Sequence, residues 1–413
     1  MSEHTAQGGH HDAGFARYRW AMLGGIWLIY YSFGVVAGSM APLVSRISQD
    51  LAIDFATMGA IMGAWPLMYI FAAIPCGILL DRLQPRLAMF IGGVLIAVSC
   101  LGRAWAFDGT GMFISVALFG LGGPLISIGA PKLITLWFDG PNRGLAMGIY
   151  ITGPALGTAS ALALTNAILL PWAGDDWRLV MQAFAALTLL TALIWFLIAS
   201  HPLASDITSR TESAAGFTLS SIPQILKLPA VQALLAMAVC IFFINHGLNN
   251  WLPEVLRAKG FTAADAGFWA SMPTMVGIAS SLIVPRFAVP SRRLAVMASI
   301  FGSVLIASLL LQAQSGAVLI FGLVLLGIAR GSMMALAMQA LMETPGVPRA
   351  QLGLAGGLFF VAAELGGVLG PVTLGVFFDR YAEFYQALLV LAGVALMLVL
   401  LTVLLARINR KNR

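Results

Sequence analysis

Long apolar runs separated by short polar segments dominate this chain of 413 residues. Each run holds about 20 residues, enough for a helix to cross a hydrocarbon layer about 30 Å thick. Runs of this length with few charges predict membrane-spanning helices rather than helices of a soluble domain. We predict twelve helices, over residues 20–44, 56–79, 87–106, 112–137, 145–170, 178–200, 229–252, 264–285, 294–313, 317–341, 353–377 and 385–406.

One long polar connection, residues 201–228, lies between the sixth and seventh predicted helices. Its serines and its few large apolar side chains are typical of a flexible linker. The linker divides the chain into a six-helix bundle over 20–200 and a second over 229–406. We expect an N-terminal tail over 1–19 and a basic C-terminal tail over 407–413, both cytoplasmic.

The two predicted halves have related sequences. The fifth span reads AMGIYITGPALGTA from Ala146, and the eleventh reads AGGLFFVAAELGGV from Ala355. This alignment pairs Gly148 with Gly357, Tyr150 with Phe359, Leu156 with Leu365 and Gly157 with Gly366. Two related halves of six helices are typical of secondary transporters built from internal repeats.

Composition and charge agree with a membrane protein. The chain is 60% hydrophobic and 10% charged, too little charge to cover the surface of a soluble domain. Its net charge of +6 comes from Lys and Arg at the ends of the spans, which argues against a nucleic-acid partner. With both termini inside, 15 Lys and Arg fall on the cytoplasmic side and 6 on the other. The positive-inside rule therefore predicts cytoplasmic termini, and we expect the bacterial inner membrane.

The sequence predicts no metal site, no cofactor and no enzymatic activity. Cys76, Cys100 and Cys240 are isolated in apolar surroundings, which suggests small buried side chains rather than ligands or disulfides. The spans contain no HExxH or GxSxG pattern, so a membrane-embedded enzyme is the remote alternative.

The segment Gly77–Arg86, GILLDRLQPR, follows the second span and carries Asp81 beside Arg82. It resembles the loop between spans two and three of the major facilitator superfamily, with the pattern G-x-x-x-D-R/K-x-G-R-R/K. The resemblance covers nearly the whole chain and implies an all-α fold of twelve transmembrane helices in two pseudo-symmetric bundles. It also implies a conformational latch at Gly77, Asp81, Arg82 and Arg86, although Gln84 replaces the loop glycine of the family. The alternative is a group of ordinary solvated charges.

The fifth and eleventh spans contain glycine–proline segments. Proline loosens the hydrogen-bond ladder of a membrane helix, and small residues allow close helix packing. The segment in the fifth span resembles a family motif. We predict a role as hinge or as packing surface for Gly148, Gly153, Pro154, Gly157, Gly370 and Pro371.

Four ionisable side chains lie within predicted spans: Lys132, His246, Arg330 and Glu364. Each buried charge costs at least about 2.5–3.5 kcal/mol, so it needs a partner or a water-filled cavity. By the resemblance, spans one, four, seven and ten line a central cavity. The predicted substrate-binding residues are Arg330, Lys132, His246, Asn245, Asn249, Tyr30, Tyr31, Tyr150 and Gln339.

These residues predict a carrier for a small anion. The planar guanidinium of Arg330 suits a carboxylate, nitrate or phosphate. We predict a proton-coupled symporter of a small organic anion that works by alternating access as a monomer, with Glu364 and His246 as proton carriers. Several alternatives stay open. Arg330 and Glu364 can form a structural ion pair, Lys132 can reach the membrane interface, and His246 can simply pack. With Arg330 locked in such a pair and Glu364 as a proton site, the protein would be a drug or metabolite exporter of the same fold.

Two phrases, PKLITLWF and RGSMMALAMQALMETPG, are similar to bacterial permeases of the cyanate and nitrate/nitrite type and to carriers of small organic anions. The nitrate porters place an arginine in spans two and eight. Here the second span has none, which argues against nitrate as the substrate.

Overall fold

The computed structural model describes residues 4–202, 204, 222–348 and 351–411, and within these ranges all regular structure is helical. The side chains of 4–17, 81 and 411 lie outside the description. Within the described ranges, twelve helices are long and apolar enough to cross a membrane, which confirms the predicted number and the all-α class. Most of the predicted linker, residues 203 and 205–221, lies outside the described residues.

The first half contains the spans predicted before the linker. Its elements are α1 (His4–Gly38), η1 (Ala41–Leu43), α2 (Val44–Asp50), α3 (Phe55–Arg82), α4 (Pro85–Ala104), α5 (Gly109–Trp137), α6 (Gly140–Leu164), η2 (Thr165–Leu169), α7 (Leu170–Trp172) and α8 (Trp177–Ala199). The second half contains α10 (Ile222–Leu226), α11 (Pro229–Arg257), α12 (Ala263–Ile283), η4 (Val284–Phe287), α13 (Arg293–Leu310), α14 (Ala317–Met342), α15 (Leu352–Tyr381) and α16 (Tyr385–Lys411).

Several predicted boundaries differ from the structure. Helix α1 begins at His4, within the predicted tail, and α16 continues to Lys411, because an existing helix extends at little cost into residues that tolerate helical backbone. The predicted first span is interrupted after Gly38, where Pro42 starts a short 3₁₀ turn. The predicted fifth span loses regular α-helix at Thr165–Leu169, a π-helical turn.

The structure shows the internal repeat suggested by the sequence. Gly157 of α6 lies against α1, and a Cβ atom there would be 2.0 Å from the Tyr31 carbonyl oxygen. Its aligned partner, Gly366 of α15, lies against α11, with a Cβ position 1.9 Å from the Val239 carbonyl oxygen. The two aligned glycines therefore make equivalent backbone contacts in the two halves, as small residues do in membrane helix pairs.

We expect Gly157→Ala to lower stability, because the added methyl must push α6 away from α1. Overpacking of this kind costs about 1–3 kcal/mol. Gly148→Ala is the matched control on the same helix, since its nearest neighbour beyond the local helix, Leu282 Cδ2, is 3.8 Å from the new Cβ. The midpoint of thermal unfolding in detergent should fall for Gly157→Ala alone. Reduced transport with unchanged unfolding midpoints in both variants would instead indicate a hinge.

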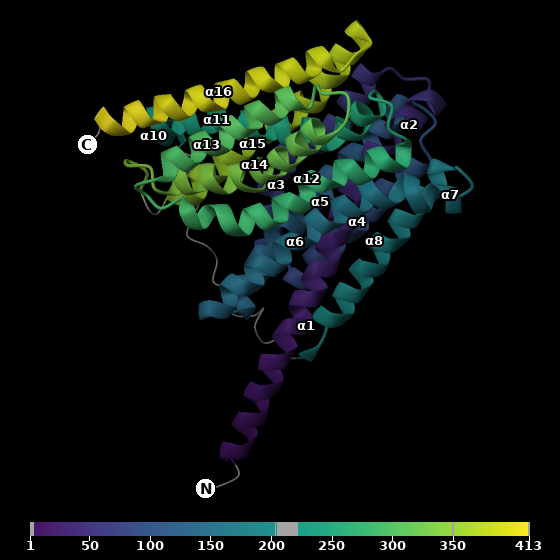
Figure 1. Cartoon of the computed structure of the whole chain (residues 1–413). Helices are drawn as coiled ribbons and strands as arrows, with labels where there is room; N and C mark the ends of the chain where they lie inside the picture. Colours follow the sequence, from purple (N-terminus) through teal and green to yellow (C-terminus); the bar gives the residue numbers. More distant parts are fainter. Residues whose placement is uncertain (1–3, 203, 205–221, 349–350, 412–413) are drawn as a thin grey trace.

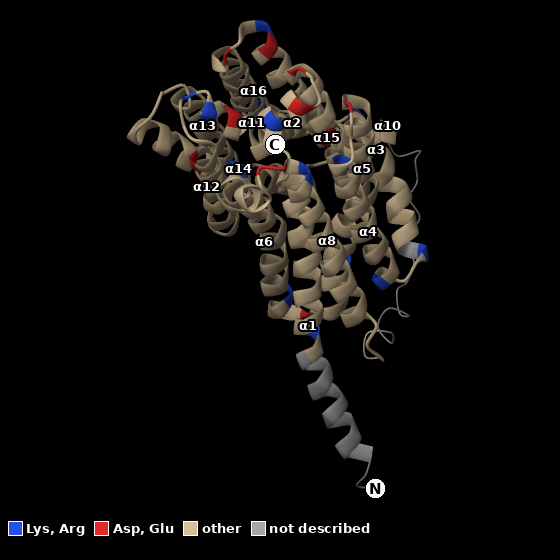
Figure 2. Cartoon of the chain, turned by 90° about the vertical axis from the view of Figure 1, so that its right-hand side faces the viewer, with Lys and Arg blue, Asp and Glu red and all other residues tan. Residues whose placement is uncertain are grey.

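The two halves meet at one end of the molecule. Figure 1 shows them converging near α2 and spreading apart toward the chain ends marked N and C. We call the end with α2 and α7 the loop end, and the end where α16 finishes the terminus end. Figure 2 shows that Lys, Arg, Asp and Glu gather mainly at the helix ends, with long uncharged stretches between them.

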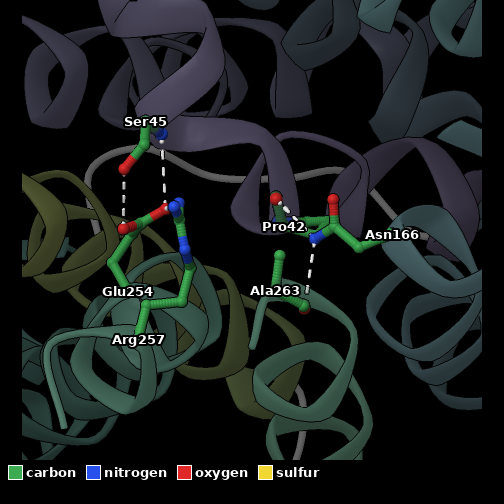
Figure 3. A network of polar contacts seen from close by, with 6 residues as sticks. All are labelled: Pro42, Ser45, Asn166, Glu254, Arg257 and Ala263. Carbon is green, nitrogen blue, oxygen red and sulfur yellow. Dashed lines mark hydrogen bonds and ion pairs between the residues drawn. The ribbon is translucent and has the colours of Figure 1, made fainter. Parts of the chain in front are cut away.

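Polar contacts join the halves at the loop end (Figure 3). The buried carboxylate of Glu254 accepts hydrogen bonds from the Ser45 amide at 3.3 Å and the Ser45 hydroxyl at 2.8 Å. Arg257 donates to the same carboxylate at 2.9 Å. The Asn166 amide donates to the carbonyl oxygens of Pro42 and Ala263, which lie in different halves. The loop end is therefore closed in this conformation.

Candidate functional site

A cavity of about 350 Å³ lies between the two halves. This volume is within the range of small-molecule sites, which is about 300–1,000 Å³. Helix α6 of the first half forms one wall, and α11, α12 and α14 of the second half form the others. The lining residues are Ile151, Thr152, Pro154, Ala155, Thr158, Phe242, Asn245, His246, Asn249, Pro273, Thr274, Gly277, Ile278, Ser281, Arg330, Gly331 and Met334.

Arg330 from α14 is held in the cavity by two asparagines of α11. Its Nε donates to Asn245 Oδ1 at 2.9 Å, and its Nη2 donates to the Asn245 carbonyl oxygen at 3.3 Å. Nη2 also donates to Asn249 Oδ1. The asparagines are four residues apart, so both lie on the same face of α11 and reach one guanidinium.

This arrangement presents several hydrogen-bond donors. The arginine side chain cannot accept a hydrogen bond, so both asparagines must turn their side-chain oxygens toward it. Their NH₂ groups are then left for another partner. Within the part of the chain that the structure describes, Arg330 Nη1 has no hydrogen-bond acceptor. No Asp or Glu is among the described lining residues. A cation with free donors and no carboxylate paired with it is suited to bind an anion.

Glu364 of α15 is buried, with 4% of its surface exposed. Among the described residues, its Oε2 has no hydrogen-bond partner. A Cβ atom at Gly367 would lie 3.0 Å from this oxygen and 3.2 Å from His246 Nδ1, so the carboxyl and imidazole are close neighbours. Arg330 and Glu364, both described, form no ion pair in this conformation. The alternative of a structural Arg330–Glu364 ion pair is therefore not formed in this conformation, in which Arg330 donates to the two asparagines.

His246 lies where the halves meet. Its ring stacks on Phe242 of the same helix at 5.2 Å between centroids, and it contacts Trp65 of α3 at 5.0 Å. His246 also lines the cavity that contains Arg330, so its imidazole both packs on aromatic rings and borders the cavity. Packing and proton transfer are both compatible with this position.

Other predicted binding residues lie outside the lining of this cavity. Tyr30 stacks on Tyr150 with a centroid distance of 5.8 Å, and Tyr31 stacks on Trp27 at 5.4 Å. Lys132 donates to the Leu80 carbonyl oxygen at 3.4 Å. Gln339 lies on α14 beyond the lining residues.

Spans one and four (α1 and α5), which the resemblance assigns to the central cavity, contribute none of the described lining residues here, and the wall on the side of the first half comes from α6. Helix α6 forms that wall because its small residues pack directly on α1. A Cβ at Gly34 would lie 2.1 Å from the Pro154 carbonyl oxygen, and Thr158 donates to the Gly34 carbonyl oxygen at 3.0 Å. Sequence reasoning also missed the α12 wall, although Thr274, Ile278 and Ser281 have the spacing of one helix face.

The predicted latch at Gly77–Arg86 lies at the terminus end. A Cβ atom at Gly77 would meet nothing within 4 Å among the described residues, so no described helix packs on it in this conformation. The Arg86 guanidinium lies over the Phe196 ring at 5.2 Å, and its carbonyl oxygen accepts a hydrogen bond from Trp195 at 3.1 Å. The Asp81 side chain lies outside the described residues. The latch therefore stays a prediction.

The fold and the cavity between two related halves are those of a secondary transporter. The family model of the Major Facilitator Superfamily matches residues 22–371, and the chain belongs to this superfamily. Among solved structures, it is similar to a bacterial homologue of the human lysosomal transporter Spinster in an inward-facing, unoccupied conformation. The TM-score is 0.75 at 17% identity, with 96% of this chain and 98% of that chain covered. The nucleoside transporter NupG gives a TM-score of 0.78 at 14% identity, with coverages of 93% and 99%.

Several relatives at the sequence level are named as transporters of organic acids. The chain is 25% identical over 396 residues to a D-galactonate transporter of Escherichia coli O6:H1, covering 87% of this chain and 88% of the relative. It is 24% identical over 397 residues to the probable galactarate/D-glucarate transporter GudP of Escherichia coli K12, covering 86% of each. An uncharacterised transporter of Bacillus subtilis, YycB, is 22% identical over 362 residues, covering 87% of each.

Proposed function

We propose that this protein carries a small organic acid anion across the membrane, coupled to protons. The observation that carries the proposal is Arg330, a guanidinium held by Asn245 and Asn249 in the cavity between the halves, with no carboxylate among the described lining residues. Relatives named for galactonate, galactarate or glucarate, tartrate and hexuronate transport support an organic acid as substrate.

The proposed mechanism is alternating access. The positive-inside rule assigns the terminus end to the cytoplasm, so the described conformation faces inward. Contacts such as Ser45–Glu254 then close the extracellular end. Rocking of the two halves would break these contacts and close the cytoplasmic end around the same central site.

Glu364 and His246 are the proposed proton carriers. A buried carboxylate without a hydrogen-bond partner is costly in a membrane protein, and proton uptake relieves that cost. His246 lines the cavity that contains Arg330, and the Glu364 carboxyl is a close neighbour of His246, so proton uptake at these groups can be coupled to anion binding. This arrangement favours symport.

Counterflow in proteoliposomes tests the proposed function. Vesicles loaded with an unlabelled acid should accumulate the labelled acid by exchange, and an inward proton gradient should drive net uptake. The panel should include aliphatic and aromatic monocarboxylates, sugar acids, dicarboxylates, nitrate and lipophilic cations. Exchange of lipophilic cations without exchange of any acid would overturn the proposal in favour of an exporter.

A further inference from the structure

Most free hydrogen-bond donors of the cavity lie at the Arg330 site, and the Thr274 hydroxyl and the His246 ring are the other polar groups of the lining without a described backbone acceptor. Three hydroxyls elsewhere in the lining already donate their protons to backbone carbonyls. These are Thr152 to Ile149 at 2.7 Å, Thr158 to Gly34 at 3.0 Å and Ser281 to Ile278 at 2.8 Å. Thr152 also accepts from Trp27 at 3.0 Å. These hydroxyls therefore have no proton left to donate to a ligand.

The remaining surface of the cavity is mostly apolar. Side chains of Ile151, Pro154 and Ala155 come from α6, and Phe242, Pro273, Ile278 and Met334 come from the second half. A substrate hydroxyl placed against such a surface loses its hydrogen bonds to water without replacement. Only one permanent cation, Arg330, is among the described lining residues, so one carboxylate balances its charge.

We infer that the substrate is a monocarboxylate with an apolar body, rather than a polyhydroxylated acid or a dicarboxylate. This inference rests on the proposed function. The carboxylate binds Arg330 Nη1 and the asparagine NH₂ groups, and the apolar body lies between α6 and α12.

Competition with two acids of similar size and charge tests this inference. In the counterflow assay, 3-phenylpropanoate should compete at a concentration about tenfold or more below that of D-galactonate, because each buried hydroxyl without a partner weakens binding. Succinate should also compete poorly. Equal or stronger competition by D-galactonate would overturn the inference but leave the proposed function intact. If no acid competes, both the inference and the proposed function are wrong.

A variant provides a second measurement. Ile278→Asn adds an amide to the apolar wall and should reduce the preference for 3-phenylpropanoate over D-galactonate about tenfold. Ile283→Asn adds the same amide to α12 at an exposed position outside the cavity lining and should leave the ratio unchanged. An unchanged ratio in Ile278→Asn, with exchange retained, would contradict an apolar body at α12.

A second, independent observation concerns the loop end of α15. The residues Gly375–Arg380 read GVFFDR and repeat the G-x-x-x-D-R spacing of Gly77–Arg82 at the end of α3. A Cβ atom at Gly375 would lie 2.2 Å from the Phe55 carbonyl oxygen, whereas Gly77 meets nothing. The copy at the loop end is therefore packed across the two halves, and the copy at the terminus end is not.

Asp379 in this segment caps a helix of the other half. Its carboxylate accepts hydrogen bonds from the backbone amides of Phe55 at 3.1 Å and Ala56 at 2.5 Å, at the start of α3. Asp54 accepts from the Thr57 amide at 2.8 Å, so both acids together satisfy the first amides of the helix. The Phe55 ring also stacks on Phe378 at 4.5 Å between centroids.

The geometry points to Gly375, Phe378 and Asp379 as an extracellular latch that stabilises the inward-facing conformation. Separation of the halves at this end would expose the Phe55 and Ala56 amides and remove both hydrogen bonds that Asp379 accepts from them. Loss of a helix-capping carboxylate is expected to shift the ratio of inward- to outward-facing molecules about tenfold.

Distances between spin labels on Gln49 and Gln314 test the latch independently of transport. Both side chains are exposed near the loop end, and the three native cysteines are buried and replaceable by alanine. Asp379→Ala should increase the longer-distance population about tenfold, with a smaller shift for Asp379→Asn. Asp108→Ala is the matched control, because Asp108 caps α5 within one half. Identical distance distributions in Asp379→Ala and the unmodified chain would overturn the assignment.

Discussion

Replacement of Arg330 by alanine should strongly weaken binding of the transported anion. The substitution removes the guanidinium that supplies the only permanent positive charge among the described cavity-lining residues. Truncation of one member of a buried charged pair costs about 2–5 kcal/mol, so the apparent affinity should fall about 30-fold or more. Counterflow of the labelled acid over a range of concentrations gives this affinity.

Arg330→Lys separates charge from geometry. Lysine keeps the positive charge but cannot donate to Asn245, Asn249 and a carboxylate with the fixed fork of a guanidinium, so we expect weak residual exchange. Lys132→Met is the control, because Lys132 lies outside the cavity lining and donates to the Leu80 carbonyl oxygen. Normal exchange by a well-folded Arg330→Ala protein would refute the role of Arg330. A large loss of affinity in Lys132→Met would restore Lys132 as a binding residue.

Replacement of Glu364 by glutamine should uncouple anion exchange from protons. Glutamine resembles the protonated carboxyl in size and charge but cannot release a proton. We therefore expect uptake driven by a proton gradient to fall roughly tenfold or more, while exchange at equal pH continues. Uptake and counterflow measured on the same vesicles between pH 5 and pH 8 should show loss of pH dependence in the variant.

Glu254→Gln is the matched control for this experiment. Glu254 is also a buried glutamate, but it accepts hydrogen bonds from Ser45 and Arg257, whereas Glu364 Oε2 has no partner among the described residues. The control should retain its pH dependence even if closure of the loop end weakens. If Glu364→Gln keeps gradient-driven uptake, His246 becomes the candidate proton carrier, and His246→Asn should then remove the pH dependence.

The sequence by itself determined the class of this protein. Twelve apolar runs predicted twelve spans, since a helix needs about 20 residues to cross the bilayer and little else in a sequence has that length. The aligned Gly157 and Gly366 revealed the repeat of the two halves, and the structure places both against equivalent helices. Arg330, Asn245, Asn249 and His246 were singled out because polar side chains are rare and costly within spans.

Only the tertiary structure decided which helix faces form the cavity. In a membrane helix both the lipid-facing and the packed surfaces are apolar, so periodicity does not show which side meets a neighbour. Small residues of α6 let it lie directly on α1, which leaves Tyr30 and Tyr31 outside the lining and brings Thr152 into it. Close packing of Gly331 on Gly277 places α12 beside Arg330.

The polar contacts between the halves could not be predicted from the sequence either. Asp379 and Phe55 are separated by 324 positions, and no local pattern joins a carboxylate to the first amide of a distant helix. Glu364 was singled out because a glutamate is rare within a membrane span. Its distance from Arg330, however, depends on how α11 packs against both α14 and α15. Local chemistry therefore determined the spans and the unusual residues, whereas helix packing determined their partners.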